Sequence, residues 1–551
     1  MSKFACYREV LNIEILVRFV KSMKIKFHRV ISTLEQGPAP RWVVVGAGSL
    51  VGAYFIYFTT HVFQSWLLWD DFFNTHYYWS RPVSALIKGN LIFFSDYYRP
   101  LGGIFFLGLY KVFGINAMAT HLAVLAILLI DLFILYGIAF ALSDAREIGF
   151  FCALLGAYHF HLRDLYFQGG MVYDSLAFLF FFSCLWWYVR IRKSGQTASW
   201  TQIGGLLALF ICALNAKEIS VCLPLLIISY ELLYHPLRRW TPRAILTWSV
   251  TEGRFALVAG ISAVMYAVGK SIGPEALSNN PVFRPHLSLA TYLGNYGSHI
   301  TGLFYGAFQV RAVGAGVILG GMLLVAIVVR SRMLAFSALL AILGFLPVGF
   351  IELRNGYAIY VPFGGWVMYV ATLTVRLRDL VVQALSVLVA KLHVTVWPGL
   401  RVIKPVPILI CFAWFVVPQN YRGIEMIGEG LRADEYGLHT SYQQLSQIGH
   451  KLRPGANVLL IRDSSPVSAP AITFLIRLFY GDKRLQAVRA KEFCARRESV
   501  PLRQYDLVLD YEQGRYIDLT SHWTAADMAG ICKQPDEYID QQGKVVRLMR
   551  R

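Results

Sequence analysis

The chain has 551 residues, of which 56% are hydrophobic and 15% are charged, and its formal net charge is +19. A soluble globular protein is less apolar and has about a quarter of its residues charged, so this composition excludes the soluble classes. The basic residues cluster between apolar runs, which argues against a nucleic-acid partner. Apolar runs of about 17–25 residues, long enough to cross a bilayer, recur through the first three quarters of the chain. We expect an α-helical polytopic membrane protein.

The segment of residues 1–41 is basic and precedes the first apolar run. It contains Lys21, Lys24, Lys26 and Arg29, and short segments rich in lysine and arginine stay on the cytoplasmic side. The apolar run begins too late for a cleavable signal and lacks the small-residue cleavage site. The first span is therefore predicted at residues 42–64, with the amino end in the cytoplasm.

The remaining spans follow from the alternation of apolar runs and basic loops. They are predicted near residues 116–142, 148–161, 173–189, 201–215, 219–233 and 246–268, on both sides of residues 330–332, after the turn of residues 351–365, and at residues 405–418. Long outer loops are expected at residues 65–115 and 269–309, and residues 99–114 are expected to lie along the interface. With about eleven spans, every strongly basic loop falls on the inner side. Residues 42–418 are thus predicted to form a domain of the inner (plasma) membrane.

The composition changes after residue 418. The stretch "SYQQLSQIGHKLRPGANVLLIRDSS" predicts a helix, a turn and a buried strand, "APAITFLIRLFYG" another helix, and "YDLVLDYEQGRYIDL" a strand and turn. Residues 419–551 are therefore predicted to form a small extracytoplasmic α/β domain, a normal domain size. Cys494 and Cys532 fall in it, where an oxidising compartment allows a disulfide or two free thiols. No cysteine spacing resembles a zinc site.

The stretch "LLWDDFFNTHYYWSRP" places Asp70 and Asp71 directly after the first span, among aromatic residues. If this stretch is helical, Asp70 and Asn74 share one side and Asp71 lies next to them around the turn. A carboxylate at a membrane boundary costs little free energy when it is solvated and much when it is buried. The pair is either a solvated helix end or a functional site.

Further polar groups fall at the predicted outer ends of other spans. Arg99 and Arg163 could extend to lipid headgroups, Lys217 and Glu218 could pair with each other or cap a helix turn, and His159 could be a hydrogen-bonded core residue. Together these acids and bases predict a shared outer site. Its members are Asp96, Arg99, His159, His161, Arg163, Asp164, Asp174, Lys217, Glu218, Glu352, Arg354 and Tyr357.

Asp131 lies well inside the second predicted span. An intramembrane carboxylate can mark a proton or ion pathway. The more common alternative, which we favour, is a carboxyl group hydrogen-bonded within the helix bundle.

The order of these motifs resembles the polytopic GT-C glycosyltransferases, and more narrowly the protein O-mannosyltransferases and the membrane half of the tetratricopeptide-bearing O-mannosyltransferases. The similar stretches are "WDDF", "YYRPLGGIFFLGLYKVFGINAMATHLAVLAILLIDLFILY", "HFHLRDLYFQGGMVYDSLAFLFFF", "AKEISVCLPLLIISYELLY" and "LRNGYAIYVPFGG". The resemblance covers about residues 42–369 and keeps the family's order. The chain departs from the family in lacking tetratricopeptide repeats and in its looser "QGGMVYD".

The resemblance implies a sugar transfer from a polyprenyl-phosphate donor to a protein, lipid or glycan acceptor on the outer face. Asp70 or Asp71 would match the acidic residue of the first outer loop, and Asp174 a second acidic position. The donor phosphate would be held by Arg99, Arg163, Lys217 or Arg354, with His159, His161, Glu218 and Tyr357 as further substrate contacts. A divalent metal, Mg or Mn, on Asp71 and Asp174 stays open, because related enzymes differ.

Such a reaction needs a carboxylate base, cations that stabilise the departing phosphate, and a groove that admits the lipid tail. Direct displacement by the acceptor inverts the anomeric centre. The first alternative is a transporter or flippase for a lipid-linked or polar solute, which would place polar groups near the bilayer midplane. The second is a non-catalytic scaffold whose outer domain binds a partner. Convergence on one outer cavity would favour catalysis, and a central cavity around Asp131 would favour transport. The side chains expected to converge are Asp71, Asp174, Arg163, Lys217 and Arg354.

Overall fold

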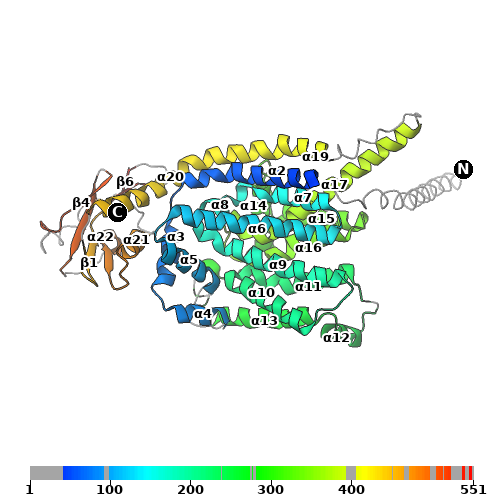
Figure 1. The fold of residues 1–551 in the computed structure, drawn as a ribbon, viewed down its shortest axis with the longest axis horizontal. Coiled ribbons are helices and arrows are strands. Elements are labelled where there is room, and N and C mark those ends of the chain that lie inside the picture. The colour runs from blue at the N-terminus through cyan, green and yellow to red at the C-terminus, as the bar shows by residue number, and fades with distance from the viewer. Residues whose placement is uncertain are drawn as a thin grey trace. The chain divides into compact units, whose positions relative to one another are not determined.

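The structure is a computed structural model that describes residues 41–91, 99–237, 239–272, 276, 279, 281–391, 405–448, 451–463, 471–496, 504–512, 514–522, 536–539 and 545–548. Two compact units, residues 1–52 and 53–551, make up the chain. The contacts given below all lie within the second unit. Most of the described residues are helical (Figure 1).

Five segments are long and apolar enough to cross a membrane: Trp42–Gln64, Ala117–Ser143, Gly169–Lys193, Arg332–Gly349 and Gly356–Leu385. They contain helices α2 (Arg41–Thr59), α6 (Ala117–Ser143), α9 (Val172–Lys193), α16 (Arg332–Gly349) and α17 (Tyr360–Lys391). Each coincides with a predicted span, which confirms the membrane-protein class. The count of eleven spans and their orientation stay predictions.

The other predicted spans correspond to helices that are shorter or less apolar. These are α7 (Arg146–Ala157), α10 (Trp200–Ala216), α11 (Leu223–Tyr234), α13 (Arg254–Ser271) and α15 (Ala312–Val328). In the bundle, α6 packs against both α7 and α9, and α16 packs along α17. At Gly365, an added Cβ would lie 2.5 Å from the backbone nitrogen of Ala341, so α16 and α17 approach closely only because this residue is glycine.

Two predicted boundaries are wrong. The predicted span at 246–268 is interrupted, because α12 (Pro242–Val250) ends before the polar residues Thr251 and Glu252 and α13 begins at Arg254. The predicted outer loop 269–309 contains the helix α14 (Leu289–Leu303), whose first turn is capped when Ser288 Oγ accepts a hydrogen bond from the Thr291 amide at 3.0 Å. Its polar residues obscured the helical pattern in the sequence.

The loops predicted to be cytoplasmic come together through ion pairs. Lys193 pairs with Asp144 and Arg378 with Glu147. Arg192 and Glu231 form a buried pair whose Nε and Oε1 atoms are 2.8 Å apart. Inside the bundle, Tyr360 donates a hydrogen bond to Asp131 Oδ2 at 3.3 Å, which confirms the favoured interpretation of Asp131.

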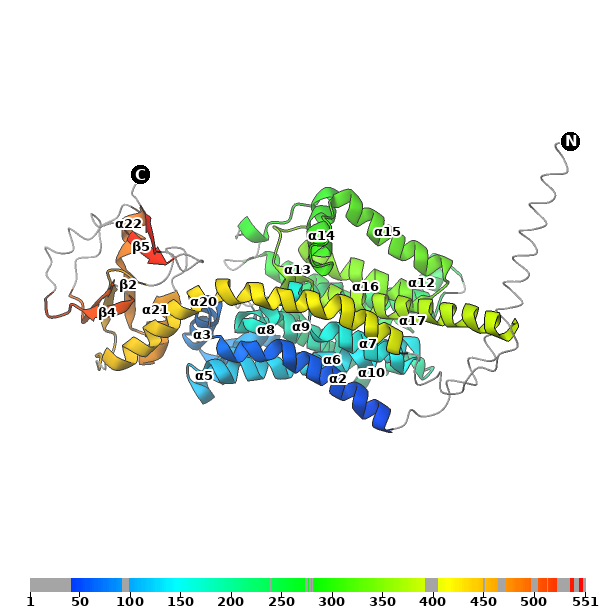
Figure 2. The same cartoon turned by 90° about the horizontal axis from the view of Figure 1, so that it is seen from above.

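The end of the membrane part and the start of the C-terminal domain are one helical stretch. Helix α19 (Val406–Cys411) passes through a short π-helical segment, Phe412–Val416, into α20 (Val417–Ile448). The predicted boundary at 418 therefore lies inside a helix, and Figure 2 shows α20 extending from the helix bundle to the strands. A hydrogen bond of 2.9 Å from Gln444 Nε2 to the Gly514 carbonyl ties α20 to the sheet.

The C-terminal domain is α/β, as predicted. Its four-stranded sheet has the order β2 (Gln486–Arg489), β1 (Asn457–Leu460), β3 (Leu507–Glu512), β4 (Arg515–Asp518), flanked by α21 (Ala471–Tyr480) and α22 (Ala490–Arg496). The central strand β1 pairs in parallel with β2 and β3, and β3 forms an antiparallel hairpin with β4. A separate antiparallel pair joins β5 (Asp536–Ile539) and β6 (Val545–Leu548). Cys532 and the side chain of Cys494 lie outside the described residues.

The predicted outer loop 65–115 is largely helical and is built into the C-terminal domain. It contains α3 (Trp69–Trp79), α4 (Val83–Leu91) and α5 (Pro100–Phe113). Leu67 and Phe72 belong to the same buried apolar cluster as residues of α20, α21 and the sheet. Tyr110 of α5 donates a hydrogen bond to the Leu478 carbonyl of α21 at 2.7 Å. The helix that carries the acidic pair is therefore packed on one side by the C-terminal domain.

Candidate active site

Helix α3 fixes the acidic pair at its first turn. Asp71 occupies the third helical position, and its Oδ2 accepts a hydrogen bond from the Leu68 amide at 2.8 Å. This satisfies one of the amides that have no partner inside a helix. Asn74 follows Asp70 by one turn, and its Oδ1 accepts a hydrogen bond from Tyr173 of α9 at 2.7 Å. The helix and the shared side of Asp70 and Asn74 are as predicted.

A cavity of about 520 Å³ lies beside this turn, and polar side chains from six parts of the chain converge on it. Its apolar walls include Phe73, Met171, Val221, Phe283, Pro347 and Ile351. A cavity of this size suits a small-molecule substrate. The polar lining residues are Asp70, Asn74, Arg99, Tyr173, Asp174, Lys217, Glu218, Tyr266, Lys270, Ser271, Arg354 and Tyr357.

Two ion pairs join side chains that line the cavity. Arg99 contacts both carboxylate oxygens of Glu218, with Nη2 to Oε2 at 2.8 Å and Nε to Oε1 at 3.2 Å. Lys217 pairs with Asp174, and its ammonium group lies 4.8 Å from the centroid of the Tyr357 ring. Lys217 and Glu218 thus bind separate partners, so the idea that they pair with each other is wrong.

Burial shifts the pKa values of these side chains toward their neutral forms, and the ion pairs oppose that shift. Burial lowers the pKa of Lys217 to about 8, although the charge of Asp174 partly opposes this shift. Burial would raise the pKa of Glu218, but the Arg99 guanidinium outweighs it and holds the pKa below the usual value. Glu218 is therefore ionised near neutral pH, and Lys217 keeps its proton below about pH 8.

Asp70 differs from the other carboxylates of the cavity. Its carboxylate forms no hydrogen bond or ion pair with any residue that the structure describes. Burial raises the pKa of Asp70 to about 6, against the attraction of Arg354 and Arg99. A carboxylate with a pKa near neutrality that faces a cavity is suited to accept a proton from a substrate.

Arg354 and Lys270 complete the positive charge around Asp70. The Arg354 guanidinium lies 4.8 Å from the centroid of the Phe283 ring and forms no ion pair with a described residue. Lys270 stands at the end of α13, with its ammonium group 5.7 Å from the centroid of the Tyr266 ring. Four basic side chains face three carboxylates in this cavity, which leaves one positive charge in excess.

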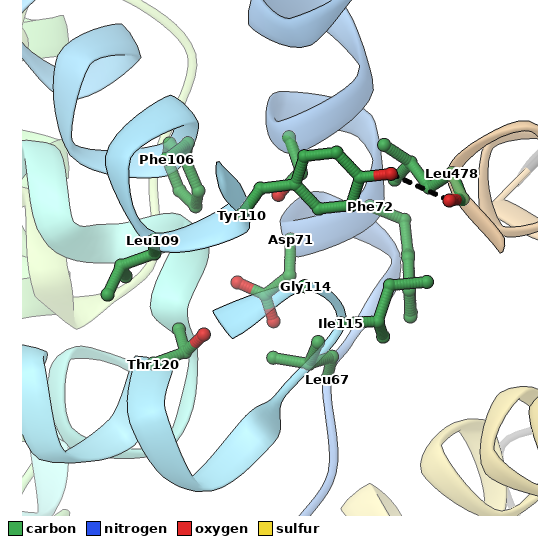
Figure 3. A pocket seen from close by; sticks show the side chains of 11 residues that line it. Leu67, Asp71, Phe72, Phe106, Leu109, Tyr110, Gly114, Ile115, Thr120 and Leu478 are labelled. Atoms are coloured by element: carbon green, nitrogen blue, oxygen red, sulfur yellow. Dashed lines mark hydrogen bonds between the residues drawn. The ribbon is translucent and has the colours of Figure 1, made fainter. Parts of the chain in front are cut away.

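Six predicted site residues that the structure describes lie outside the lining of the large cavity: Asp71, His159, His161, Arg163, Asp164 and Glu352. Asp96 lies outside the described residues. Asp71 faces a separate small pocket (Figure 3). His159 is buried, with its Nε2 atom 3.1 Å from the Leu303 carbonyl, as expected of a core histidine. His161 Nε2 lies 3.1 Å from His299 Nδ1, and Arg163 lies over the Phe160 ring, outside the lining of the large cavity.

Lys270 is a cavity residue that sequence reasoning missed. It ends the apolar stretch of α13 and begins the second predicted outer loop, so its position at a membrane boundary was a usable signal. Gly170 was quoted only as part of a motif, yet it lines the cavity against Asp70, and an added Cβ there would lie 2.6 Å from Asp70 Cβ.

The metal site left open by the sequence required Asp71 and Asp174 together. These two carboxylates line different pockets. Within the described ranges, no three side chains of His, Cys, Asp or Glu come together as a metal-binding group. The residues present therefore do not fit the predicted metal.

The sequence was compared with known protein families and with curated proteins. No protein-family model matches the chain. No curated protein matches it closely enough to identify a relative. The geometry of the cavity and the chemistry of its side chains are thus the basis for a functional assignment.

Proposed function

We propose that the chain is an integral-membrane glycosyltransferase that moves a sugar from a polyprenyl-phosphate carrier to an acceptor hydroxyl on the outer face of the membrane, with Asp70 as the base. One observation carries this proposal. Asp70, whose pKa lies near neutrality, shares a cavity with four basic side chains whose charges exceed those of its three carboxylates by one, which favours a bound phosphate group. Asp70 takes this role here, whereas the sequence alone slightly favoured Asp71 over Asp70.

The donor phosphate binds to Arg354, which forms no ion pair with a described residue, and Lys270 lines the same cavity and adds to its positive charge. A phosphodiester carries one negative charge, which matches the one excess positive charge of the cavity. Arg354 supplies a planar, multiple-donor group, and Lys270 a compact charge. Their attraction grows as charge develops on the departing phosphate, so it stabilises the transition state more than the bound donor.

The lipid chain of the donor follows the exposed face of α13. Leu257, Ile261, Val264 and Val268 are all exposed, and their spacing puts them on one side of the helix. This apolar stripe ends at Val268 and is continued by Ser271 at the cavity, while Lys270 lies on the opposite side of the helix and lines the same cavity. A prenyl chain along the stripe would reach the cavity at Ser271.

The reaction is a direct displacement. Asp70 accepts the proton of the acceptor hydroxyl while the hydroxyl oxygen forms a bond to the anomeric carbon. The bond from that carbon to the phosphate oxygen breaks, and its electron pair leaves with the polyprenyl phosphate. The anomeric centre is inverted. Asp174 and Lys217 hold each other and the Tyr357 ring at the cavity wall and so shape the space for the sugar.

The decisive experiment measures release of the carrier phosphate by purified protein given a panel of polyprenyl-phosphate sugars and a membrane extract as acceptor source. Asp70→Asn keeps the size of the side chain but removes the base, so we expect release to fall by about a hundredfold or more. Arg163→Gln, which changes a cation outside the cavity, is the matched control and should retain activity. Equal release by the wild-type protein and Asp70→Asn would refute the assignment.

A further inference from the structure

A second, much smaller pocket of about 20 Å³ lies on the side of α3 that Asp71 faces. Figure 3 shows Asp71, Thr120 of α6 and Tyr110 of α5 around it, with Leu478 of the C-terminal domain at its edge. Most of the remaining lining is apolar. The pocket is therefore built from both halves of the protein.

Asp71 presents an unsatisfied oxygen to this pocket. The residue is 2% exposed, and its Oδ2 atom accepts the Leu68 amide. Its Oδ1 atom is buried and has no hydrogen-bond partner among the described residues. A buried polar atom without a partner costs about 1–3 kcal/mol, so such atoms usually mark a bound water or ion.

The volume and the polar groups fit one water molecule. A cavity needs about 10–15 Å³ and two to four polar partners to hold a water. Asp71 Oδ1 provides one partner and the Thr120 hydroxyl a second (Figure 3), and Thr75 is the remaining residue of the lining with a side-chain hydroxyl besides Tyr110. Thr120 Oγ1 donates to the Asn116 carbonyl at 3.1 Å and retains lone pairs to accept from a water.

The charges around the pocket favour a neutral Asp71. Asp71 and Tyr110 are the only titratable residues of its lining, and the Tyr110 hydroxyl is engaged by the Leu478 carbonyl. Neither α5, α6 nor α21 contributes a basic side chain to the lining, and the nearest carboxylate on α3 is Asp70. Burial raises the pKa of Asp71 to about 7. The Leu68 and Gly170 amides partly offset this rise, and the charge of Asp70 adds to it.

We propose that the pocket binds a single water between Asp71 and Thr120, and that protonated Asp71 is a positioning residue that fixes the direction of Asp70. The Leu68 amide keeps Oδ2 as the acceptor, so the proton is on Oδ1, which donates to the water. The role of Asp71 rests on the proposed function of Asp70, whereas the water and the proton do not.

The Gly169–Gly170 turn links the position of Asp71 to that of Asp70. An added Cβ at Gly169 would lie 2.5 Å from Asp71 Oδ1, and one at Gly170 would lie 2.6 Å from Asp70 Cβ. The turn therefore packs against both acidic residues at once. When Asp71 holds the first turn of α3 to this glycine pair, the Asp70 carboxylate has a fixed direction into the cavity.

The first test does not depend on activity. Infrared difference spectra of the purified protein between pH 5 and pH 9 should show a protonated-carboxyl band that titrates near pH 7. The band should be absent in Asp71→Asn, shifted in Thr120→Val, which removes a partner of the water, and restored in Thr120→Ser. A band that is the same in Asp71→Asn and wild type would overturn the protonation. A band unchanged in Thr120→Val would overturn the bridging water.

The second test addresses the positioning role. Asp71→Asn imitates the neutral acid and should retain kcat within about threefold, whereas Asp71→Ala should lower kcat by about a hundredfold with little change in KM for the donor. A loss in Asp71→Asn as large as in Asp70→Asn would overturn the role of a neutral Asp71. If the wild-type protein transfers no sugar, the proposed function fails, and the infrared result still decides the protonation and the water.

Discussion

Asp70 and Asp71 are neighbours in the sequence but point about 100° apart around α3. Asp70 lines the large cavity beside Arg354, while Asp71 caps the helix and faces the small pocket. Burial raises the pKa of both carboxyls, yet only Asp70 is placed to meet a substrate. Two identical side chains thus receive different tasks from their surroundings.

The pH dependence of activity follows from Asp70, Asp71 and Lys217. Asp70 is a base only after it has lost its proton, so activity should rise with pH through about 6. The Asp71 proton and the Lys217 charge are both lost at higher pH, so activity should fall as pH rises from about 7 to about 8. We expect a bell-shaped profile of kcat/KM between these limits. A rate that keeps rising above pH 9 would contradict the roles of Asp71 and Lys217.

Gly170 gives a second prediction at this scale. In Gly170→Ala the new methyl group would meet Asp70 Cβ at 2.6 Å, so the acid or the turn must shift. A displacement of this kind should lower kcat by about tenfold to a hundredfold. Gly108→Ala is the control, because nothing lies within 4 Å of its added Cβ, and it should leave the rate unchanged. Equal activity of both variants would show that the turn does not position Asp70.

At the scale of elements, α3 belongs both to the core of the C-terminal domain and to the wall of the large cavity. Phe72 is 1% exposed and belongs to the apolar core of the C-terminal domain, while Asp70 of the same helix lines the cavity. The stacking of Trp66 on His439, with ring centroids 4.9 Å apart, strengthens the same contact. The C-terminal domain is therefore part of the support of the candidate site.

Two adjacent phenylalanines test this support. Phe72→Ala removes a buried ring and should lower the free energy of unfolding of the C-terminal domain by about 3–5 kcal/mol. Phe73→Ala is the matched control, because Phe73 is 42% exposed. Chemical unfolding of the purified protein, followed by tryptophan fluorescence, measures both, since Trp66 and Trp79 pack against this core. Equal stability of the two variants would mean that α3 and the C-terminal domain unfold independently.

At the scale of the whole molecule, the orientation in the membrane is a prediction with a direct test. The ion-paired loops around Lys193 are expected in the cytoplasm and the C-terminal domain outside. Ser194 and Ser446 are both exposed. In intact cells, a membrane-impermeant thiol reagent should label Ser446→Cys but should label Ser194→Cys only after permeabilisation, each compared with the wild-type background. The reverse pattern would invert the topology and place the cavity on the cytoplasmic side.

The sequence determined the membrane class, the five long apolar helices, the helix at the acidic pair and the α/β domain. These features follow from apolar length and periodicity, which are local properties of the chain. The helix α14 and the interruption before α13 were not predicted, because polar residues in a packed helix do not produce a clear local pattern.

Only the tertiary structure decided which polar residues meet. The sequence placed Asp70, Arg163, Lys217 and His159 at membrane boundaries without distinguishing them, and it did not single out Lys270. Folding brings Asp70, Lys217 and Lys270 to one cavity and leaves His159 and Arg163 elsewhere. It also separates Asp70 from Asp71 by their directions around one helix turn. Local sequence sets the depth of a residue in the bundle, whereas the packing of distant helices sets its neighbours, and the chemistry of a site depends on those neighbours.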